Sequence, residues 1–140
     1  MTSERALKLA LRVMGVIPVV MGGYAVVTGA RPIPGSGHVS ASVDSEMRFM
    51  SAWYVGGGLV AFGAARDPKA EPTLVRLLCA IVLLGALGRV LSIMRLGRPP
   101  RLFLFLLGVE LAVPALIVPW QAAVARQAGD PVPRSGAEPA

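Results

Sequence analysis

The stretch VLLGALGRVLSIMRLGRPPRLFLFLLGVE, residues 82–110, decides the fold of this 140-residue chain. It consists of two apolar runs joined by a short basic turn, and each run carries one charged residue far from the turn, Arg89 in the first and Glu110 in the second. If the chain reverses at Pro99 and Pro100, both charges lie about ten residues, or about 15 Å of helix, from the turn. A charge near the middle of a membrane costs at least a few kcal/mol unless it is paired or hydrated. We therefore predict two antiparallel membrane helices that are joined by an intramembrane charge pair, Arg89 and Glu110.

The composition of the whole chain points to the same class of protein. Hydrophobic residues make up 54% of the sequence and charged residues only 16%, which is less charge than a soluble domain of this length normally carries. The apolar residues gather in four runs that are each long enough to cross a membrane. We predict an all-α integral membrane protein, a four-transmembrane-helix antiparallel bundle forming one domain over residues 1–126. The expected helices span residues 6–28, 44–65, 73–96 and 102–124, and residues 127–140 are expected to form a disordered polar tail.

Four crossings would place both termini on the same side of the membrane, and the basic residues suggest which side. On the side of the termini the chain would carry eight basic residues: Arg5, Lys8, Arg12, Arg66, Lys69, Arg76, Arg126 and Arg134. On the other side it would carry five: Arg31, Arg48, Arg95, Arg98 and Arg101. This excess favours cytoplasmic termini in a bacterial cytoplasmic membrane. The net charge of +6 suits contact with anionic lipid headgroups, and no basic face with interleaved aromatic residues indicates a nucleic-acid partner.

A second set of polar residues opens the second helix after a loop rich in Gly, Pro and Ser. Asp44 is placed to cap that helix, and Arg48, four residues later, is placed to pair with it. Antiparallel packing brings the start of the second helix near the end of the third. The possible polar pocket would then combine Asp44, Glu46, Arg48 and Ser92 with the charge pair Arg89 and Glu110. Such a group either neutralises its own charges as a structural network, or forms a pocket for a lipid, quinone or small anion, or translocates protons or ions, or catalyses a reaction.

Small residues mark the helix faces that are expected to pack closely. In the second helix Gly57, Ala61 and Ala65 recur at every fourth position, and in the third helix Gly85 and Gly88 share a face with Arg89. Side chains this small let helix backbones approach one another in a membrane. Gly57, Ala61, Gly85 and Gly88 are therefore the expected helix-packing residues, either within the bundle or between protomers. In the first helix, Gly15, Gly22 and Gly23 permit the same kind of contact.

Residues with recognisable catalytic or metal-binding spacing are missing from the sequence. The chain has one histidine, His38, and one cysteine, Cys79, and it contains no G-x-S-x-G, H-E-x-x-H or C-x-x-C motif. A single loop histidine cannot supply the ligands of a zinc site or of a bis-histidine haem. We expect no metal and no cofactor, and the sequence leans against an enzyme without excluding one.

Several short motifs resemble one known family. They are Asp44 to Phe49, the G-R-x-x-S run from Gly88 to Ser92, the turn from Gly97 to Pro99, the intramembrane Glu110, and the pair Trp120 and Gln121. Together they resemble the bacterial membrane-protein family known as domain of unknown function 4345, over residues 13–121. The resemblance implies four helices and no particular activity. A looser likeness to DoxX-type four-helix membrane proteins suggests a redox-linked accessory role by analogy of fold alone.

These observations leave three expectations about function. The first is a non-enzymatic accessory or scaffold subunit of a membrane complex, whose partners are the lipid bilayer and another membrane protein or further copies of the chain. The second is a binder or transporter of a lipid, quinone or small anion through an Arg89/Glu110 pocket. The third is a DoxX-like redox accessory protein, which would bind a quinone.

Overall fold

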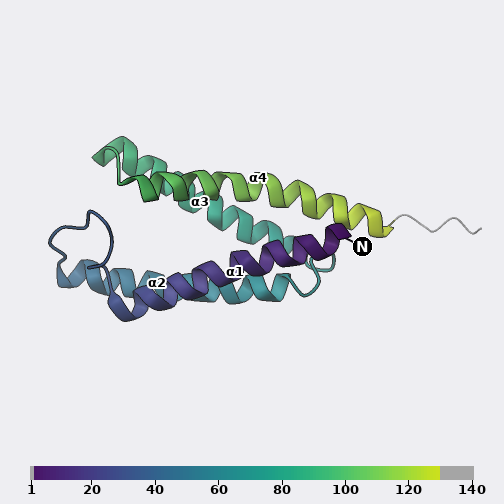
Figure 1. Cartoon of the computed structure of the whole chain (residues 1–140), viewed down its shortest axis with the longest axis horizontal. Coiled ribbons are helices and arrows are strands. Elements are labelled where there is room, and N and C mark those ends of the chain that lie inside the picture. Colours follow the sequence, from purple (N-terminus) through teal and green to yellow (C-terminus); the bar gives the residue numbers. More distant parts are fainter. Residues whose placement is uncertain (1, 130–140) are drawn as a thin grey trace, which may run out of the picture.

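The computed structural model describes residues 2–129, and this part of the chain folds into four α-helices (Figure 1). They are α1 (Thr2–Thr28), α2 (Ala41–Ala64), α3 (Pro72–Leu96) and α4 (Arg101–Gly129). The prediction of a disordered tail is wrong for residues 127–129, because α4 continues through the alanine-rich sequence that precedes them, and alanine is the strongest helix former. The rest of the expected tail lies outside the described residues.

The helix ends follow local chemistry. Ser40 caps α2, because its Oγ accepts a hydrogen bond of 3.3 Å from the backbone N–H of Val43. Asp44 lies inside the first turn instead, so the prediction that Asp44 caps this helix is wrong. Pro72 opens α3, at a position where its missing N–H has no intrahelical partner to lose. Gly97 ends α3 with a φ of 91°, a conformation that glycine adopts without strain.

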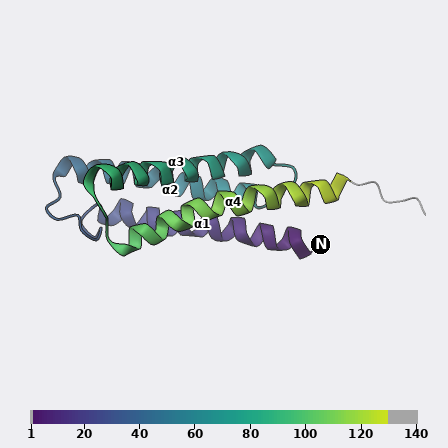
Figure 2. The same cartoon turned by 90° about the horizontal axis from the view of Figure 1, so that it is seen from above.

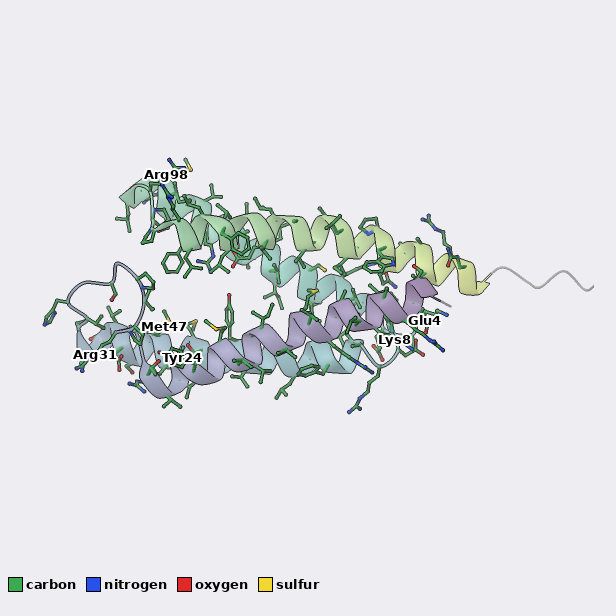
Figure 3. The ribbon with its side chains drawn as sticks, viewed as in Figure 1. Glu4, Lys8, Tyr24, Arg31, Met47 and Arg98 are labelled. Carbon is green, nitrogen blue, oxygen red and sulfur yellow. The ribbon has the colours of Figure 1, made fainter. Side chains whose placement is uncertain are left out.

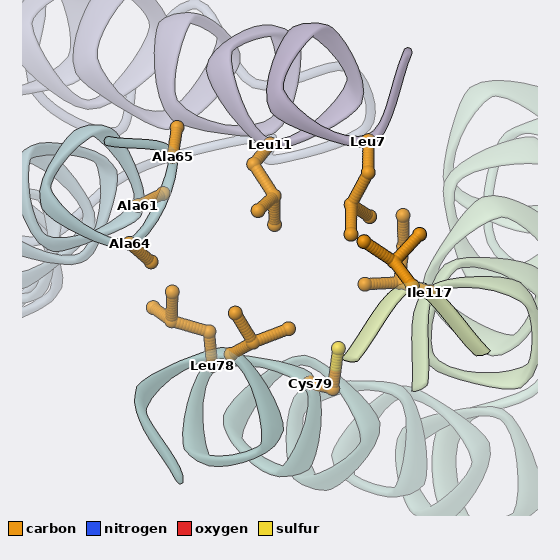
Figure 4. Close-up of a cluster of buried hydrophobic side chains, with 10 residues drawn as sticks. Leu7, Leu11, Ala61, Ala64, Ala65, Leu78, Cys79 and Ile117 are labelled. Atoms are coloured by element: carbon orange, nitrogen blue, oxygen red, sulfur yellow. The ribbon is translucent and has the colours of Figure 1, made fainter. Parts of the chain in front are cut away.

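The four helices form two antiparallel hairpins, α1 with α2 and α3 with α4 (Figures 1 and 2). The hairpins share one buried hydrophobic core at the end of the molecule where α1 begins and α4 ends. Its members come from all four helices (Figure 4): Leu7, Leu11, Ala61, Ala64, Ala65, Val75, Leu78, Cys79, Ile117 and Val124. Away from this end the hairpins part (Figure 1). The hairpins therefore share a core at one end and do not form a bundle closed along its whole length.

The hairpin of α1 and α2 is packed through glycines. A Cβ atom added at Gly58 would lie 2.6 Å from the carbonyl oxygen of Gly15 and 2.6 Å from Cγ2 of Val19. A Cβ at Gly22 would lie 2.8 Å from the carbonyl oxygen of Ser51. All three distances are shorter than a real contact allows, so the two backbones touch where only glycine fits.

Three of the four small residues named from the sequence make no close helix contact within the described chain, so for them only the expected packing between protomers stays a prediction. A Cβ at Gly57, Gly85 or Gly88 would meet no atom of the described chain within 4 Å, whereas Ala61 is 3% exposed and lies in the core. The contact in α2 is made by Gly58, the next residue. One residue turns a helix by about 100°, so a run of three glycines does not reveal which one faces the neighbouring helix.

The loop between the hairpin helices, residues 29–40, makes a second connection at the far end. Gly35 has a φ of 82°, and a Cβ there would lie 3.3 Å from Cγ of Pro100 in the α3–α4 turn. The loop bends toward that turn at the left of Figure 1. Arg31 and Arg98 lie at this end, opposite Glu4 and Lys8 (Figure 3).

Three of the four helices are long and apolar enough to cross a membrane: the spans Ser3–Thr28, Pro72–Leu96 and Arg101–Gln127. Helix α2 does not reach that standard, because Asp44, Glu46 and Arg48 open it and a run of three glycines lies at its centre. Large hydrophobic side chains are exposed on all four helices, among them Ile17 at 56%, Trp53 at 69% and Leu84 at 69%. Apolar surface of this kind is what a helix presents to lipid.

Polar contacts link the helices and the α2–α3 connection at the core end. Gln121 is 1% exposed, and its Nε2 donates a hydrogen bond of 3.1 Å to the carbonyl of Pro68 in the α2–α3 connection. The indole N–H of Trp120 donates to Oγ of Ser3 at 2.9 Å. Glu4 forms ion pairs with Lys8 at 2.8 Å and with Lys69 at 2.6 Å. These contacts tie α1 and α4 to the α2–α3 connection, and no spacing in the sequence indicates them.

Candidate functional site

Arg89 of α3 and Glu110 of α4 form an ion pair inside the second hairpin. The Nε–H of Arg89 donates to both carboxylate oxygens of Glu110, at 3.0 Å to Oε1 and 2.8 Å to Oε2. The α3–α4 turn at residues 97–100 folds the helices back so that the two residues meet. Both lie in helices that qualify as membrane spans. The pair therefore neutralises the charge that each helix carries in its apolar stretch.

Helical spacing places both residues on the faces that carry the core. Along α3, Val75, Cys79 and Ala86 are buried, and Arg89 follows at the next i+3 step of the same stripe. Along α4, Glu110 lies seven residues, or two turns, before the core residue Ile117. The pair thus faces inward, at a level beyond the core that the two hairpins share.

The pair is shielded incompletely. The side chain of Arg89 is 31% exposed and that of Glu110 is 17% exposed. The aromatic ring of Phe103 lies beside the guanidinium, with its centroid 5.7 Å from Cζ, which is within the range of a cation–π contact. Within residues 2–129, no hydrogen bond is made by the two terminal nitrogens of Arg89, Nη1 and Nη2. Only one of the three guanidinium nitrogens is therefore engaged.

A partly open cavity of about 220 Å³ adjoins Arg89. Its walls all come from α3, α4 and the turn between them: Arg89, Ser92, Ile93, Pro99 and Phe103. Polar atoms of Arg89 and Ser92 and the apolar surfaces of the other three line the same space. Such a mixture suits a ligand with a polar head and an apolar body.

Asp44 and Arg48 form a separate polar group in the first hairpin. Arg48 Nε donates to Oδ2 of Asp44 at 2.8 Å, and Nη1 donates to the last carbonyls of α1, Val26 at 2.7 Å and Val27 at 2.8 Å. The other oxygen of Asp44 accepts from the N–H of Ala30 at 2.9 Å. A cation at a helix C-terminus also interacts favourably with the helix dipole. This group therefore fastens the end of α1 to the start of α2.

The electrostatic state of Asp44 follows from these contacts. The hydrogen bond from Arg48 is the larger cause and the hydrogen bond from Ala30 the second, and both lower the pKa of the Asp44 carboxyl below its ordinary value. Asp44 is consequently charged at neutral pH, and the contact with Arg48 is a true ion pair.

The six polar residues expected to converge are divided between the two hairpins. Asp44 and Arg48 bind α1, and no hydrogen bond or ion pair within the described chain joins them to Arg89, Ser92 or Glu110. Glu46 is exposed. The expected single polar pocket is thus corrected to two groups, because the hairpins part and Arg48 finds backbone carbonyls nearer to it.

Two other kinds of site are relevant in the described chain: a metal site and a cavity at the α2–α3 connection. Within residues 2–129, no group of three His, Cys, Asp or Glu residues lies close enough to hold a metal ion. A second, open cavity of about 330 Å³ lies at the α2–α3 connection, beside Arg66, Asp67 and Glu71. Asp67 there accepts hydrogen bonds from the backbone of Lys69 and Ala70, so its carboxylate shapes the turn.

Residues 6–121 match the family model described as Domain of unknown function (DUF4345), and this match covers most of the chain. The chain belongs to the DUF4345 family. The resemblance read from the motifs is confirmed, and the matched region of this DUF4345 protein contains both polar groups. No curated protein and no solved structure matches the chain.

Proposed function

We propose that this DUF4345 protein is a non-enzymatic accessory or scaffold subunit of a complex in the bacterial cytoplasmic membrane. One observation carries the proposal: the two hairpins are each held by their own contacts but share a core at one end only. Beyond that core, α1 and α2 do not pack over the inward faces of α3 and α4, the faces that carry Arg89 and Glu110, as they would in a closed bundle.

The uncovered faces contain more than apolar surface. Lipid chains can cover the apolar side chains on these faces. The part-exposed pair Arg89–Glu110, however, leaves polar atoms exposed on the same faces. Polar atoms in an apolar layer require hydrogen-bond partners, which hydrocarbon chains do not offer. A membrane helix of another protein, inserted between the hairpins, would bury the apolar faces and supply those partners. Small and polar residues on that helix would allow close approach.

The proposal includes a membrane crossing by α2, from Phe49 onward. Helix α2 lies in backbone contact with α1 at Gly15 and Gly22, and α1 is a candidate span. A helix packed this closely against a spanning helix lies at the same depth in the membrane. The run of three glycines lowers the hydropathy of α2, and one of them, Gly58, meets α1 instead of lipid. With α2 crossing, the basic residues favour cytoplasmic termini.

Cysteine labelling tests this topology. In a chain carrying Cys79→Ala, we introduce either His38→Cys, in the exposed α1–α2 loop, or Ala70→Cys, in the exposed α2–α3 connection. A membrane-impermeant maleimide applied to intact cells is expected to label position 38 and to spare position 70, which is labelled only after the cells are opened. Labelling of both positions in intact cells would mean that α2 does not cross. Labelling of position 70 alone would reverse the proposed orientation.

Native mass spectrometry of the protein, purified in a mild detergent from its own membrane, tests the accessory role. The expected result is a second polypeptide in fixed stoichiometry with the chain. A membrane complex of known subunit composition, purified from the same extract, serves as the control for detergent damage. If that control stays intact while the chain appears alone, with no mass beyond its own, the accessory role is refuted. A stoichiometric quinone or flavin in the same spectrum would instead support the DoxX-like redox role.

A further inference from the structure

The guanidinium of Arg89 has hydrogen-bonding capacity that its own chain leaves unused. An arginine side chain offers five N–H donors, and Glu110 takes only the one on Nε. The four donors on Nη1 and Nη2 make no hydrogen bond within residues 2–129, in a helix that qualifies as a membrane span. Donors left unbonded in an apolar layer are costly, so the site calls for an acceptor from outside the chain.

The arrangement of these donors indicates the kind of acceptor. The two terminal nitrogens form a flat fork that matches two oxygens on one atom, as in a carboxylate or a phosphate. A single carbonyl oxygen, such as one end of a quinone, would satisfy only part of that fork. The cavity of about 220 Å³ adjoins Arg89 and adds the hydroxyl of Ser92 as a further donor.

The surrounding charge favours an anion. Between residues 89 and 110 the chain carries four arginines, Arg89, Arg95, Arg98 and Arg101, and a single carboxylate, Glu110. The pair Arg89–Glu110 is neutral by itself, so the three arginines around the turn leave this end of the hairpin positive. A positive cluster beside a cavity between membrane helices attracts an anionic headgroup more strongly than a neutral one.

The remaining walls of the cavity are apolar. Ile93, Pro99 and Phe103 line it together with Arg89 and Ser92, and the cavity has room for a headgroup and the first carbons of a chain but not for a whole lipid. We propose that this cavity binds the oxyanion head of an amphiphile, a carboxylate or phosphate ester, while its apolar chain lies against the hairpin in the bilayer. The inference does not depend on the accessory role, because α3, α4 and their turn form the cavity alone.

Native mass spectrometry of the full chain in a neutral detergent, after removal of bound lipid, tests the proposal. The probes are phosphatidylglycerol, oleate, phosphatidylcholine and inorganic phosphate. Phosphatidylglycerol or oleate is expected to bind one to one and at least tenfold more tightly than phosphatidylcholine, and the tighter of the two identifies the headgroup. Equal binding of phosphatidylglycerol and phosphatidylcholine would overturn the proposal. If inorganic phosphate binds as tightly as phosphatidylglycerol, the site takes a free anion. That result would overturn the proposed role of the ligand's apolar chain.

Three variants locate the binding. Arg89→Gln combined with Glu110→Gln removes the fork without leaving an unpaired charge, and Ser92→Leu fills the cavity from an exposed position without touching the pair. Both are expected to weaken binding of the anionic amphiphile at least tenfold. Arg76→Gln removes one exposed arginine of α3 outside the cavity and is expected to bind as the unmodified protein does. Unchanged binding in Ser92→Leu would place the amphiphile elsewhere on the surface, and so would equal weakening by Arg76→Gln.

Discussion

Replacing Glu110 with Gln is expected to lower the free energy of unfolding by about 1.5 to 3 kcal/mol, the range for hydrogen bonds to charged groups. The amide keeps the shape of the carboxylate but loses the negative charge that faces Arg89 at 2.8 Å. Arg89 then keeps its positive charge in an apolar helix without a counter-charge. The measurement is reversible unfolding in mixed micelles, followed by circular dichroism. A Glu110→Gln protein as stable as the unmodified chain would refute a stabilising ion pair.

The double replacement Arg89→Met with Glu110→Leu separates the charge pair from the packing around it. Because both charges leave together, no unpaired charge remains, and much of the stability lost in Glu110→Gln is expected to return. Arg95→Gln, which removes an exposed arginine six residues further along α3, is the matched control and is expected to change stability little. If the cavity beside Arg89 binds an amphiphile, the double replacement folds well and loses that ligand.

Replacing Gly58 with Ala is expected to be the most damaging small change in the first hairpin. The new Cβ would meet the carbonyl oxygen of Gly15 and Cγ2 of Val19, both at 2.6 Å, and the backbone nitrogen of Val19 at 3.1 Å. Two of these three atoms belong to the α1 backbone, so relief requires the helices to move apart. Overpacking of this kind costs about 1 to 3 kcal/mol. The same unfolding measurement checks this value.

Gly57→Ala provides a matched control one residue away. A Cβ at Gly57 would meet nothing within 4 Å in the described chain. Both replacements gain up to about 1 kcal/mol of helix propensity, so the difference between the two variants isolates the contact with α1. Equal stability of Gly57→Ala and Gly58→Ala would contradict the close approach of α1 and α2. A large loss in Gly57→Ala would instead point to a partner or second copy packed on that face.

The second hairpin was predictable because its signals are local. Its two apolar runs are separated only by a turn with Gly97, Pro99 and Pro100, and a turn this short forces adjacent antiparallel helices. Equal distance from the turn then brings Arg89 opposite Glu110, and the structure gives a pair at 2.8 Å. Because an unpaired charge in an apolar helix is costly, the two residues then pair, and this cost depends on no other part of the chain.

Contacts between distant segments were not predictable in this way. The loop between α1 and α2 brings Asp44 and Arg48 to the end of α1, where Arg48 binds the carbonyl of Val26, and no spacing in the sequence indicates this. The buried bond from Gln121 to Pro68 joins residues that are 53 positions apart. Such contacts depend on the angle between helices, which many weak packing interactions set together.

By itself, the sequence determined the helical class of this protein, the second hairpin and the charge pair within it, because hydropathy, turn residues and helix rise act over short stretches. Tertiary structure alone decided that Gly58 rather than Gly57 meets α1, and that the polar residues form two groups instead of one. It also decided that the hairpins share a core at one end. The reason is geometric: a rotation of about 100° per residue, or a small change in the angle between hairpins, exchanges partners while the sequence pattern stays the same.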